Sequence, residues 1–173
     1  GTNIRSTSPI SYKGDSFQVT AQVSASAYTF TAGSEIYNSV HSQLQKASPG
    51  TNVLLWLGIN DCSAVESTFT FYRGLANKYS SLKFYAISIT GINESKTYLK
   101  NSSAQSFNAK LADKINRGKI SNLKYKSILS GNDVNTIIVG GQKIAIINYM
   151  TGDGLHYTKE GYIKLWQAMA TQF

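Results

Sequence analysis

Segments patterned as strands alternate along this chain with segments patterned as helices. The clearest strand is 52–57, an apolar run between turn residues that is typical of a strand buried on both faces of its sheet. A helical pattern follows at 67–79, a second strand at 82–89 and a second helix at 104–115. Strands joined through helices pair in parallel, so the sequence predicts an α/β fold with a mainly parallel central sheet and helices on both faces.

The same alternation extends to the C-terminus. A short strand is expected at 123–128 and a hairpin at 137–147, where two adjacent glycines supply the turn. An amphipathic helix is expected at 158–172, with Thr158 as its N-cap.

The N-terminal part is less regular. Residues 1–16 predict an irregular leader with at most a short strand at 10–13, and the alternation over 17–30 predicts a longer strand. The next helix is expected to begin after Gly33 and to end before Pro49.

The composition fits a single small globular domain over residues 1–173. Apolar residues make up 42% of the chain and charged residues 15%, which excludes a disordered polyelectrolyte. No apolar run approaches the ~20 residues of a membrane span, and the polar first residues predict no signal peptide.

The chain has a formal net charge of +8. Its lysines are scattered, whereas a nucleic-acid-binding protein is expected to concentrate them in a basic stripe, so no specific nucleic-acid partner is predicted. Attraction to acidic polymers such as cell-envelope glycans stays open.

Cysteine and histidine are scarce. The single cysteine, Cys62, excludes an internal disulfide and a cysteine-based metal site, and two histidines are too few for a histidine cluster. We interpret Cys62 as a buried or partly buried thiol, because no neighbouring base is available to activate it as a nucleophile. His41 falls within a helical pattern and is interpreted as a structural or surface histidine.

Two polar clusters fall where ligands bind in open α/β sheets, at the carboxyl ends of strands. The first, 57–61, directly follows the most apolar strand. The side-chain amide of Asn60 in this cluster can donate an N–H to a developing oxyanion. The same residues also suit an ordinary turn, in which Asn and Asp bond their own backbone.

The second cluster, 152–157, directly precedes the last helix. Asp153 and His156 are three residues apart on a turn, so the carboxylate can orient the imidazole as in the base of a nucleophilic triad. The alternative is that Asp153 caps the helix and His156 is a surface residue.

Together, G-x-N-D at 58–61 and D-x-x-H at 153–156 resemble blocks III and V of the SGNH (GDSL-type) hydrolase family. The likeness continues through 157–162, which matches the family's H-x-x-x-x-G-Y, and it covers roughly residues 22–173. The resemblance implies a flavodoxin-like three-layer α/β/α fold and a serine esterase that needs no metal or organic cofactor. It also implies that Asn60 donates to the oxyanion, that His156 is the base and that Asp153 orients it.

The family's first two blocks have counterparts near the N-terminus. Gly14-Asp15-Ser16 spells block I, which implies Ser16 as the nucleophile. Ala27 stands where block II has a glycine, and its backbone N–H can still donate to the oxyanion. Gly33 is a less suitable substitute for that glycine.

The distance along the chain between these two blocks is short. Ten residues separate Ser16 from Ala27, and a crossover between parallel strands needs about a dozen or more. Ser16 is therefore not expected to end a strand parallel to the one that Ala27 ends. Besides Ser16, the open alternatives are a nucleophile strand missing from this chain, one supplied by another segment, and a family member that has lost catalysis.

The sequence thus predicts an esterase acting on short acyl groups, O-acetyl among them, carried by glycans or small molecules. Exposed tyrosines near Asn60 or His156 are candidates for stacking on sugar rings. By analogy with the family, we expect an extracellular or cell-envelope setting in a bacterium. The alternative of another class is a non-catalytic domain on the same fold that binds a glycan or a protein partner.

Overall fold

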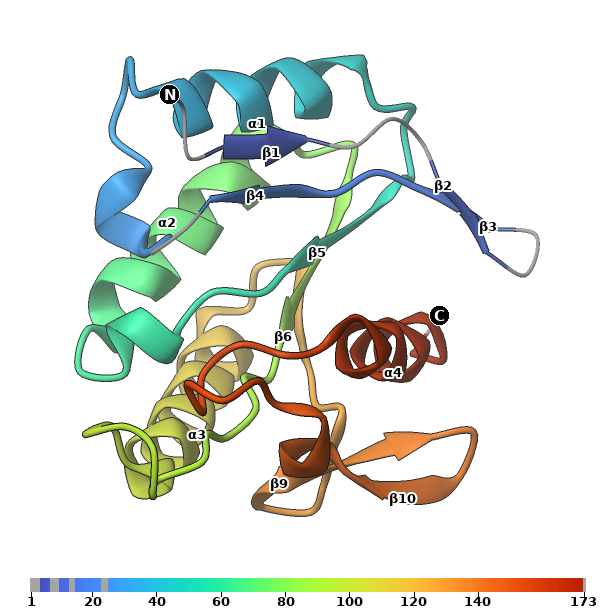
Figure 1. The fold of residues 1–173 in the computed structure, drawn as a ribbon. Coiled ribbons are helices and arrows are strands. Elements are labelled where there is room, and N and C mark those ends of the chain that lie inside the picture. The colour runs from blue at the N-terminus through green and yellow to red at the C-terminus, as the bar shows by residue number, and fades with distance from the viewer. Residues whose placement is uncertain (1–3, 7–9, 13–14, 23–24, 173) are drawn as a thin grey trace.

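The computed structural model of the chain describes residues 4–6, 10–12, 15–22 and 25–172. Its centre is a three-stranded parallel sheet of order β5-β6-β7, and α2 and α3 connect the strands (Figure 1). These elements are β5 (Asn52–Leu55), α2 (Val65–Lys78), β6 (Lys83–Ile87), α3 (Asn101–Gly118) and β7 (Leu123–Lys126). The fold is therefore mixed α/β, as predicted.

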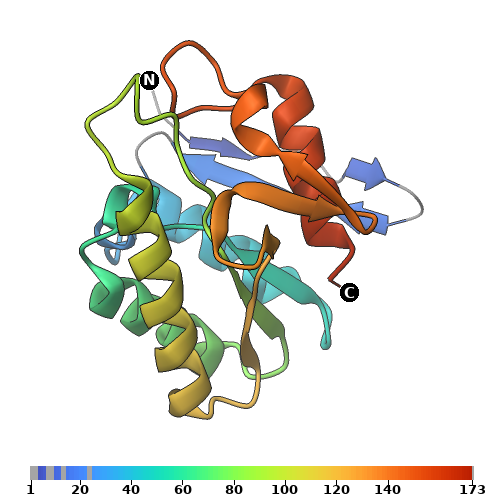
Figure 2. The same cartoon turned by 90° about the horizontal axis from the view of Figure 1, so that it is seen from below.

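Helices cover both faces of the parallel sheet, because successive side chains of a strand point to opposite faces. Phe84 of β6 packs against α2 and α3 in one buried cluster, with Tyr72 and Phe107 among its members. Ile87 of β6 packs in a second cluster, together with α4 (Lys159–Ala170), represented by Leu165. Figure 2 shows α3 and α4 on different sides of the sheet.

A second sheet accompanies the parallel one. It is antiparallel, of order β10-β9-β8, and consists of β8 (Leu129–Ser130), β9 (Asp133–Val139) and β10 (Gln142–Ala145). The hairpin expected here is confirmed, and its turn glycines, Gly140 and Gly141, have φ angles of 56° and 80°. The expectation of a mainly parallel sheet holds only for β5-β6-β7.

The expected start of one helix after Gly33 and the expected N-cap of another at Thr158 are both confirmed. α1 (Glu35–Lys46) begins after Ser34, whose hydroxyl accepts a hydrogen bond from the Tyr37 N–H at 3.2 Å. α4 begins after Thr158, whose hydroxyl accepts one from the Gly161 N–H at 3.2 Å.

The strand at 52–57 differs from its prediction. It was expected to be buried on both faces, and its side chains do alternate between the two clusters, with Leu55 in the first and Leu54 in the second. They are only half-buried, because β5 lies at the edge of the parallel sheet and pairs with β6 alone among the described strands.

The predicted strand at 17–30 is wrong in length. The structure has the three-residue β4 (Thr20–Gln22), which pairs antiparallel with β1 (Ile4–Ser6), and then a turn of 3-10 helix, η1 (Ala27–Thr29). In the chain, β2 (Ile10–Tyr12) and β3 (Asp15–Phe17) lie between β1 and β4 and form another antiparallel pair. We call β1–β4 and β2–β3 the N-terminal strand pairs.

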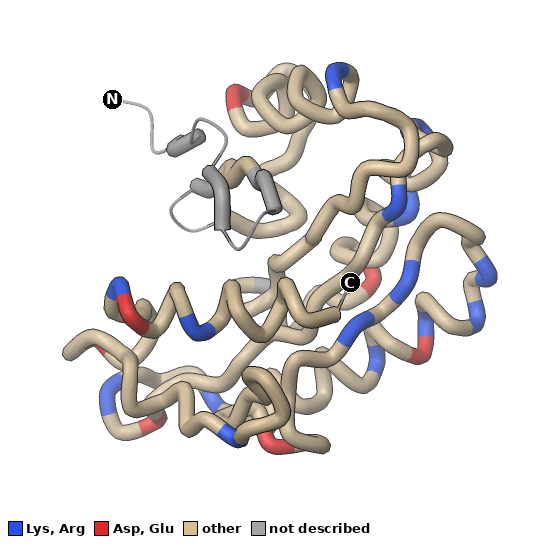
Figure 3. Tube along the Cα trace, turned by 90° about the vertical axis from the view of Figure 1, so that its right-hand side faces the viewer, with Lys and Arg blue, Asp and Glu red and all other residues tan. Residues whose placement is uncertain are grey.

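Basic residues are spread over many elements rather than gathered on one (Figure 3). Examples lie at the end of α1, at the start of β6, in β7 and in α4: Lys46, Lys83, Lys124 and Lys164. None of the described helices is both long and apolar enough to span a membrane.

Candidate active site

Three loops meet at the end of the parallel sheet where β5 and β6 finish. They are the turn 58–61 after β5, the segment 88–100 after β6, and the turn 151–157 before α4. Asn93 in the second loop donates its N–H to the carbonyl of Gly154 in the third at 3.0 Å. We call these loops together the carboxyl edge, where ligands bind in open α/β sheets.

The Asp153 carboxylate is held from several directions. One oxygen, Oδ1, accepts from the N–H groups of Leu155 at 2.9 Å and His156 at 3.0 Å, and from the Thr151 hydroxyl at 2.7 Å. The other, Oδ2, lies 2.6 Å from Nδ1 of the His156 ring. A carboxylate fixed in this way holds the imidazole in one orientation and favours the tautomer with hydrogen on Nδ1.

The same hydrogen bonds decide the charge of Asp153. The bond from the His156 ring, followed by those from the backbone and Thr151, holds the Asp153 pKa well below its usual value. The carboxylate therefore stays ionised at neutral pH. His156 is 64% exposed and Asp153 47%, so Nε2, on the far side of the ring from the carboxylate, is accessible to a substrate.

The structure contradicts one part of the alternative interpretation, the helix cap at Asp153. The N-cap of α4 is Thr158, so the helix-cap interpretation of Asp153 is wrong. Asp153 bonds the N–H groups of its own turn and the ring of His156 instead.

The turn that carries the pair is anchored on the loop after β6. Gly154 has a φ of 71°, and a Cβ there would lie 2.6 Å from Cβ of Lys96 and 2.9 Å from the carbonyl oxygen of Asn93. Only glycine fits such a close approach at a positive φ. Buried Tyr157 bonds the hydroxyl of Thr90 and donates to the carbonyl of Gly91, and burial raises the Tyr157 pKa to about 12.

Asn60 lies in the turn of 3-10 helix η2 (Ile59–Asp61). The turn depends on Gly58, whose φ is 143° and whose Cβ, if present, would lie 2.5 Å from the Phe107 ring. The exposed amide of Asn60 donates to the carbonyl of Ala25 at 3.1 Å. Because a carboxamide has two N–H bonds, one hydrogen can serve Ala25 while the other serves a ligand.

The structure thus brings Asn60 beside the segment that leads into η1 at Ala27. It does not bring the β2–β3 pair to His156. Ser16 lies in β3 with its backbone opposite Ser11, and this pair lies on the side of the molecule where α4 ends (Figure 1). His156 precedes the other end of α4. Ser16 does not end a strand of the parallel sheet, as its spacing predicts, and Gly14 lies outside the described residues.

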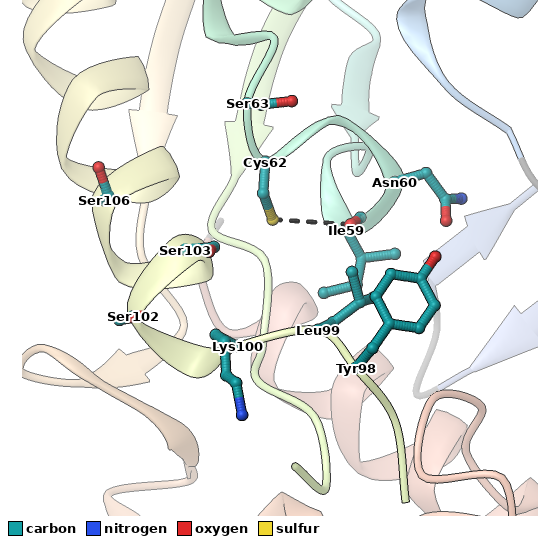
Figure 4. A pocket seen from close by; sticks show the side chains of 10 residues that line it. All are labelled: Ile59, Asn60, Cys62, Ser63, Tyr98, Leu99, Lys100, Ser102, Ser103 and Ser106. Atoms are coloured by element: carbon teal, nitrogen blue, oxygen red, sulfur yellow. Dashed lines mark hydrogen bonds between the residues drawn. The ribbon is translucent and has the colours of Figure 1, made fainter.

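An open pocket of about 460 Å³ lies next to Asn60 (Figure 4). One wall of the pocket is the turn after β5 that contains Asn60. The opposite wall is the end of the 88–100 loop together with the first turns of α3. No role was predicted from the sequence for the residues between the strand at 82–89 and the helix at 104–115. The one signal available was Tyr98, the single aromatic residue of 88–100.

Cys62 and His41 have the surroundings of structural residues. Cys62 is half-buried, and its thiol donates to the carbonyl of Gly58 at 3.3 Å, which supports the turn before Asn60. His41 is buried against the Tyr79 hydroxyl, and desolvation, together with nearby Lys78, lowers the His41 pKa.

No protein-family model matches the chain, and no curated protein matches it. In the part of the chain that the structure describes, no three His, Cys, Asp or Glu side chains are grouped as metal ligands would be.

Proposed function

We propose that this chain is an ester hydrolase of the SGNH type, with a flavodoxin-like three-layer α/β/α fold. Its substrates carry short acyl groups, O-acetyl among them, on glycans or small molecules. The observation that carries the proposal is the 2.6 Å contact between the Asp153 carboxylate and Nδ1 of an exposed histidine at the carboxyl edge. Helices on both faces of a parallel sheet support the fold assignment.

In this proposal His156 is the general base. Asp153 accepts the hydrogen on Nδ1 of His156, so Nε2 keeps a lone pair that can take the proton of a serine hydroxyl. The serine oxygen then bonds to the acyl carbon, and the ester C–O bond breaks as the alcohol receives that proton. A water molecule then gives a proton to Nε2 of His156 and attacks the acyl-enzyme. The acid leaves as the serine oxygen takes that proton back.

Asn60 and Ala27 form the proposed oxyanion hole. The carbonyl of Ala25 accepts a hydrogen bond from the amide of Asn60 two residues before Ala27, which supports a hole made of a side-chain N–H of Asn60 and the backbone N–H of Ala27. Donors fixed before the reaction stabilise the charge that develops on the carbonyl oxygen.

Ser16 is the nucleophile that the family motif implies, and the reaction requires the β2–β3 pair to reach the His156 ring. Ser26 offers another hydroxyl, because it directly precedes η1 beside the segment that Asn60 contacts. Ser24 is a further candidate and lies outside the described residues. The extracellular or cell-envelope setting is part of the same proposal.

The separation of β3 from His156 favours one alternative function. A chain whose serine never reaches the base is a non-catalytic domain, and its carboxyl edge would bind a glycan or a protein partner. This alternative keeps the fold and the pocket but predicts no turnover.

A fluorophosphonate probe distinguishes the two functions, because it reacts covalently with a serine that a base and an oxyanion hole assist. The folded protein is treated, digested and searched for the adduct by mass spectrometry. An adduct on Ser16 that disappears in His156→Ala supports the proposal in full, and one on Ser24 or Ser26 supports the esterase with a different nucleophile. No adduct, together with no hydrolysis of p-nitrophenyl acetate, rejects the enzyme.

A further inference from the structure

The pocket beside Asn60 has two walls from different parts of the chain (Figure 4). One is the turn after β5 and the other is the end of the 88–100 loop with the start of α3. Its lining includes Ile59 and Asn60 on the first wall and Tyr98, Leu99, Lys100 and Ser103 on the second. Asn60 lines this pocket and is also part of the proposed oxyanion hole, so the pocket directly adjoins that hole.

Serine is the commonest polar residue of the lining. Four serines line the pocket, one in the first wall and three in the first turns of α3, together with Asn60 and Lys100. A serine hydroxyl both donates and accepts a hydrogen bond. Such a surface complements a ligand that itself carries many groups able to do both, which is the property of a polyol.

Tyr98 gives the pocket a flat apolar surface. Its side chain is 89% exposed, the highest value among the exposed large hydrophobic side chains of the described residues. In Figure 4 the ring rises from the second wall, with its hydroxyl on the side of Asn60. A tyrosine ring with an apolar face and a polar end suits a ligand that is itself apolar on one face and polar at its edge.

We propose that this pocket binds the alcohol part of the ester and that this part is a sugar ring. The C–H face of the sugar packs on the Tyr98 ring, and its hydroxyls bond Ser103 and Lys100. The inference rests on the proposed function, since the pocket is assigned to the substrate of that site. It adds the class of the leaving alcohol and the residues that select it.

The test compares two acetate esters that share an acyl group. One is a monoacetylated glucose, and the other is ethyl acetate, which has no ring to pack on Tyr98. In Tyr98→Ala we expect kcat/KM for the sugar ester to fall about tenfold, which corresponds to about 1.4 kcal/mol. The value for ethyl acetate should change less than about twofold. Tyr98→Phe should keep most of the activity on the sugar ester, because it keeps the ring.

Matched variants and a third ester separate the explanations. Ile163→Ala removes an exposed apolar side chain on α4 that is not part of the pocket and should leave both rates unchanged. Ser103→Ala should lower the rate on the sugar ester alone. An equal loss on ethyl acetate in Tyr98→Ala contradicts the inference, as does an equal loss on naphthyl acetate, which would make the ring a general apolar contact.

Failure of the proposed function is recognised separately. If the wild-type chain hydrolyses none of these esters, binding of cellotetraose is measured by saturation-transfer NMR. Saturation transfer that is present in the wild type and lost in Tyr98→Ala supports the sugar pocket without the esterase. Absence of transfer in the wild type overturns the pocket as well.

Discussion

The carboxyl edge and the N-terminal strand pairs contain the two halves of one expected site, and they are built differently. At the carboxyl edge, a buried core supports the loops, and hydrogen bonds join one loop to the next, as between Asn93 and Gly154. The N-terminal pairs are two-stranded sheets of three-residue strands. A two-stranded pair is only marginally stable by itself, so its position depends on what it packs against.

The difference shows what a short motif requires to become a site. The D-x-x-H motif fixes its own geometry, since Asp153 and His156 lie on one turn and bond each other. The G-D-S motif does not determine the position of any residue outside its own three, and its serine lies in an antiparallel strand pair rather than at the end of a central strand. The proposed catalytic role of the carboxyl edge can therefore be tested more sharply than the proposed role of Ser16.

The largest effect is expected when the base is removed. His156→Ala leaves no group to take the proton of the nucleophile, so kcat for p-nitrophenyl acetate should fall about a thousandfold or more. His156 is exposed, so the melting temperature should change little. His41→Gln is the matched control in the other histidine and should retain activity. Full activity in His156→Ala would remove this edge from the mechanism.

Asp153→Asn tests orientation with the histidine still present. An amide in place of the carboxylate favours the wrong tautomer of His156, and we expect kcat to fall by about 10²–10⁴. Asp133→Asn is a matched control, because Asp133 caps a similar turn through Asn135 and Thr136 and has no histidine partner. Equal activity in the two variants would show that Asp153 stabilises its own turn and does not orient His156 for catalysis.

Asn60→Ala removes the proposed oxyanion donor. The expected loss is about 10²–10³ in kcat, with KM and the melting temperature little changed, because the side chain is exposed. Asn116→Ala, an exposed asparagine on α3, serves as the control. A change in KM alone would assign Asn60 to substrate binding rather than to the transition state.

A smaller effect is expected from Gly154, which lets the turn 151–157 that carries His156 pack closely on the 88–100 loop. Gly154→Ala places a Cβ 2.9 Å from the carbonyl oxygen of Asn93 at a positive φ, so the turn must shift. We expect about a tenfold loss of kcat/KM and about 1–3 kcal/mol of lost stability. Gly152→Ala, two residues earlier, meets nothing within 4 Å and should behave as the wild type. Similar results for the two variants would show that the contact between the loops has no role in positioning His156.

Local patterns predicted much of the fold and part of the site. The helix starts at Ser34 and Thr158, the turn at Gly140-Gly141 and the pairing of Asp153 with His156 all depend on residues close together in sequence. Interactions of this kind are visible in the sequence because the chain brings the partners together by its own geometry.

The remainder depends on contacts between distant segments. No local pattern shows that β4 pairs with β1, that β5 lies at the edge of its sheet, or that the Asn60 amide reaches Ala25. The pocket was missed for the same reason, since Ile59 and Tyr98 share it only once α2 and β6 have folded between them.

The central claim is that the carboxyl edge holds a histidine prepared to act as a base. The ¹⁵N chemical shifts of the His156 ring at neutral pH test it directly, with His41 as the second histidine in the same spectrum. We predict hydrogen on Nδ1 and a free lone pair on Nε2, with loss of this preference in Asp153→Asn. A wild-type His156 with its hydrogen on Nε2, unchanged in Asp153→Asn, would contradict the claim.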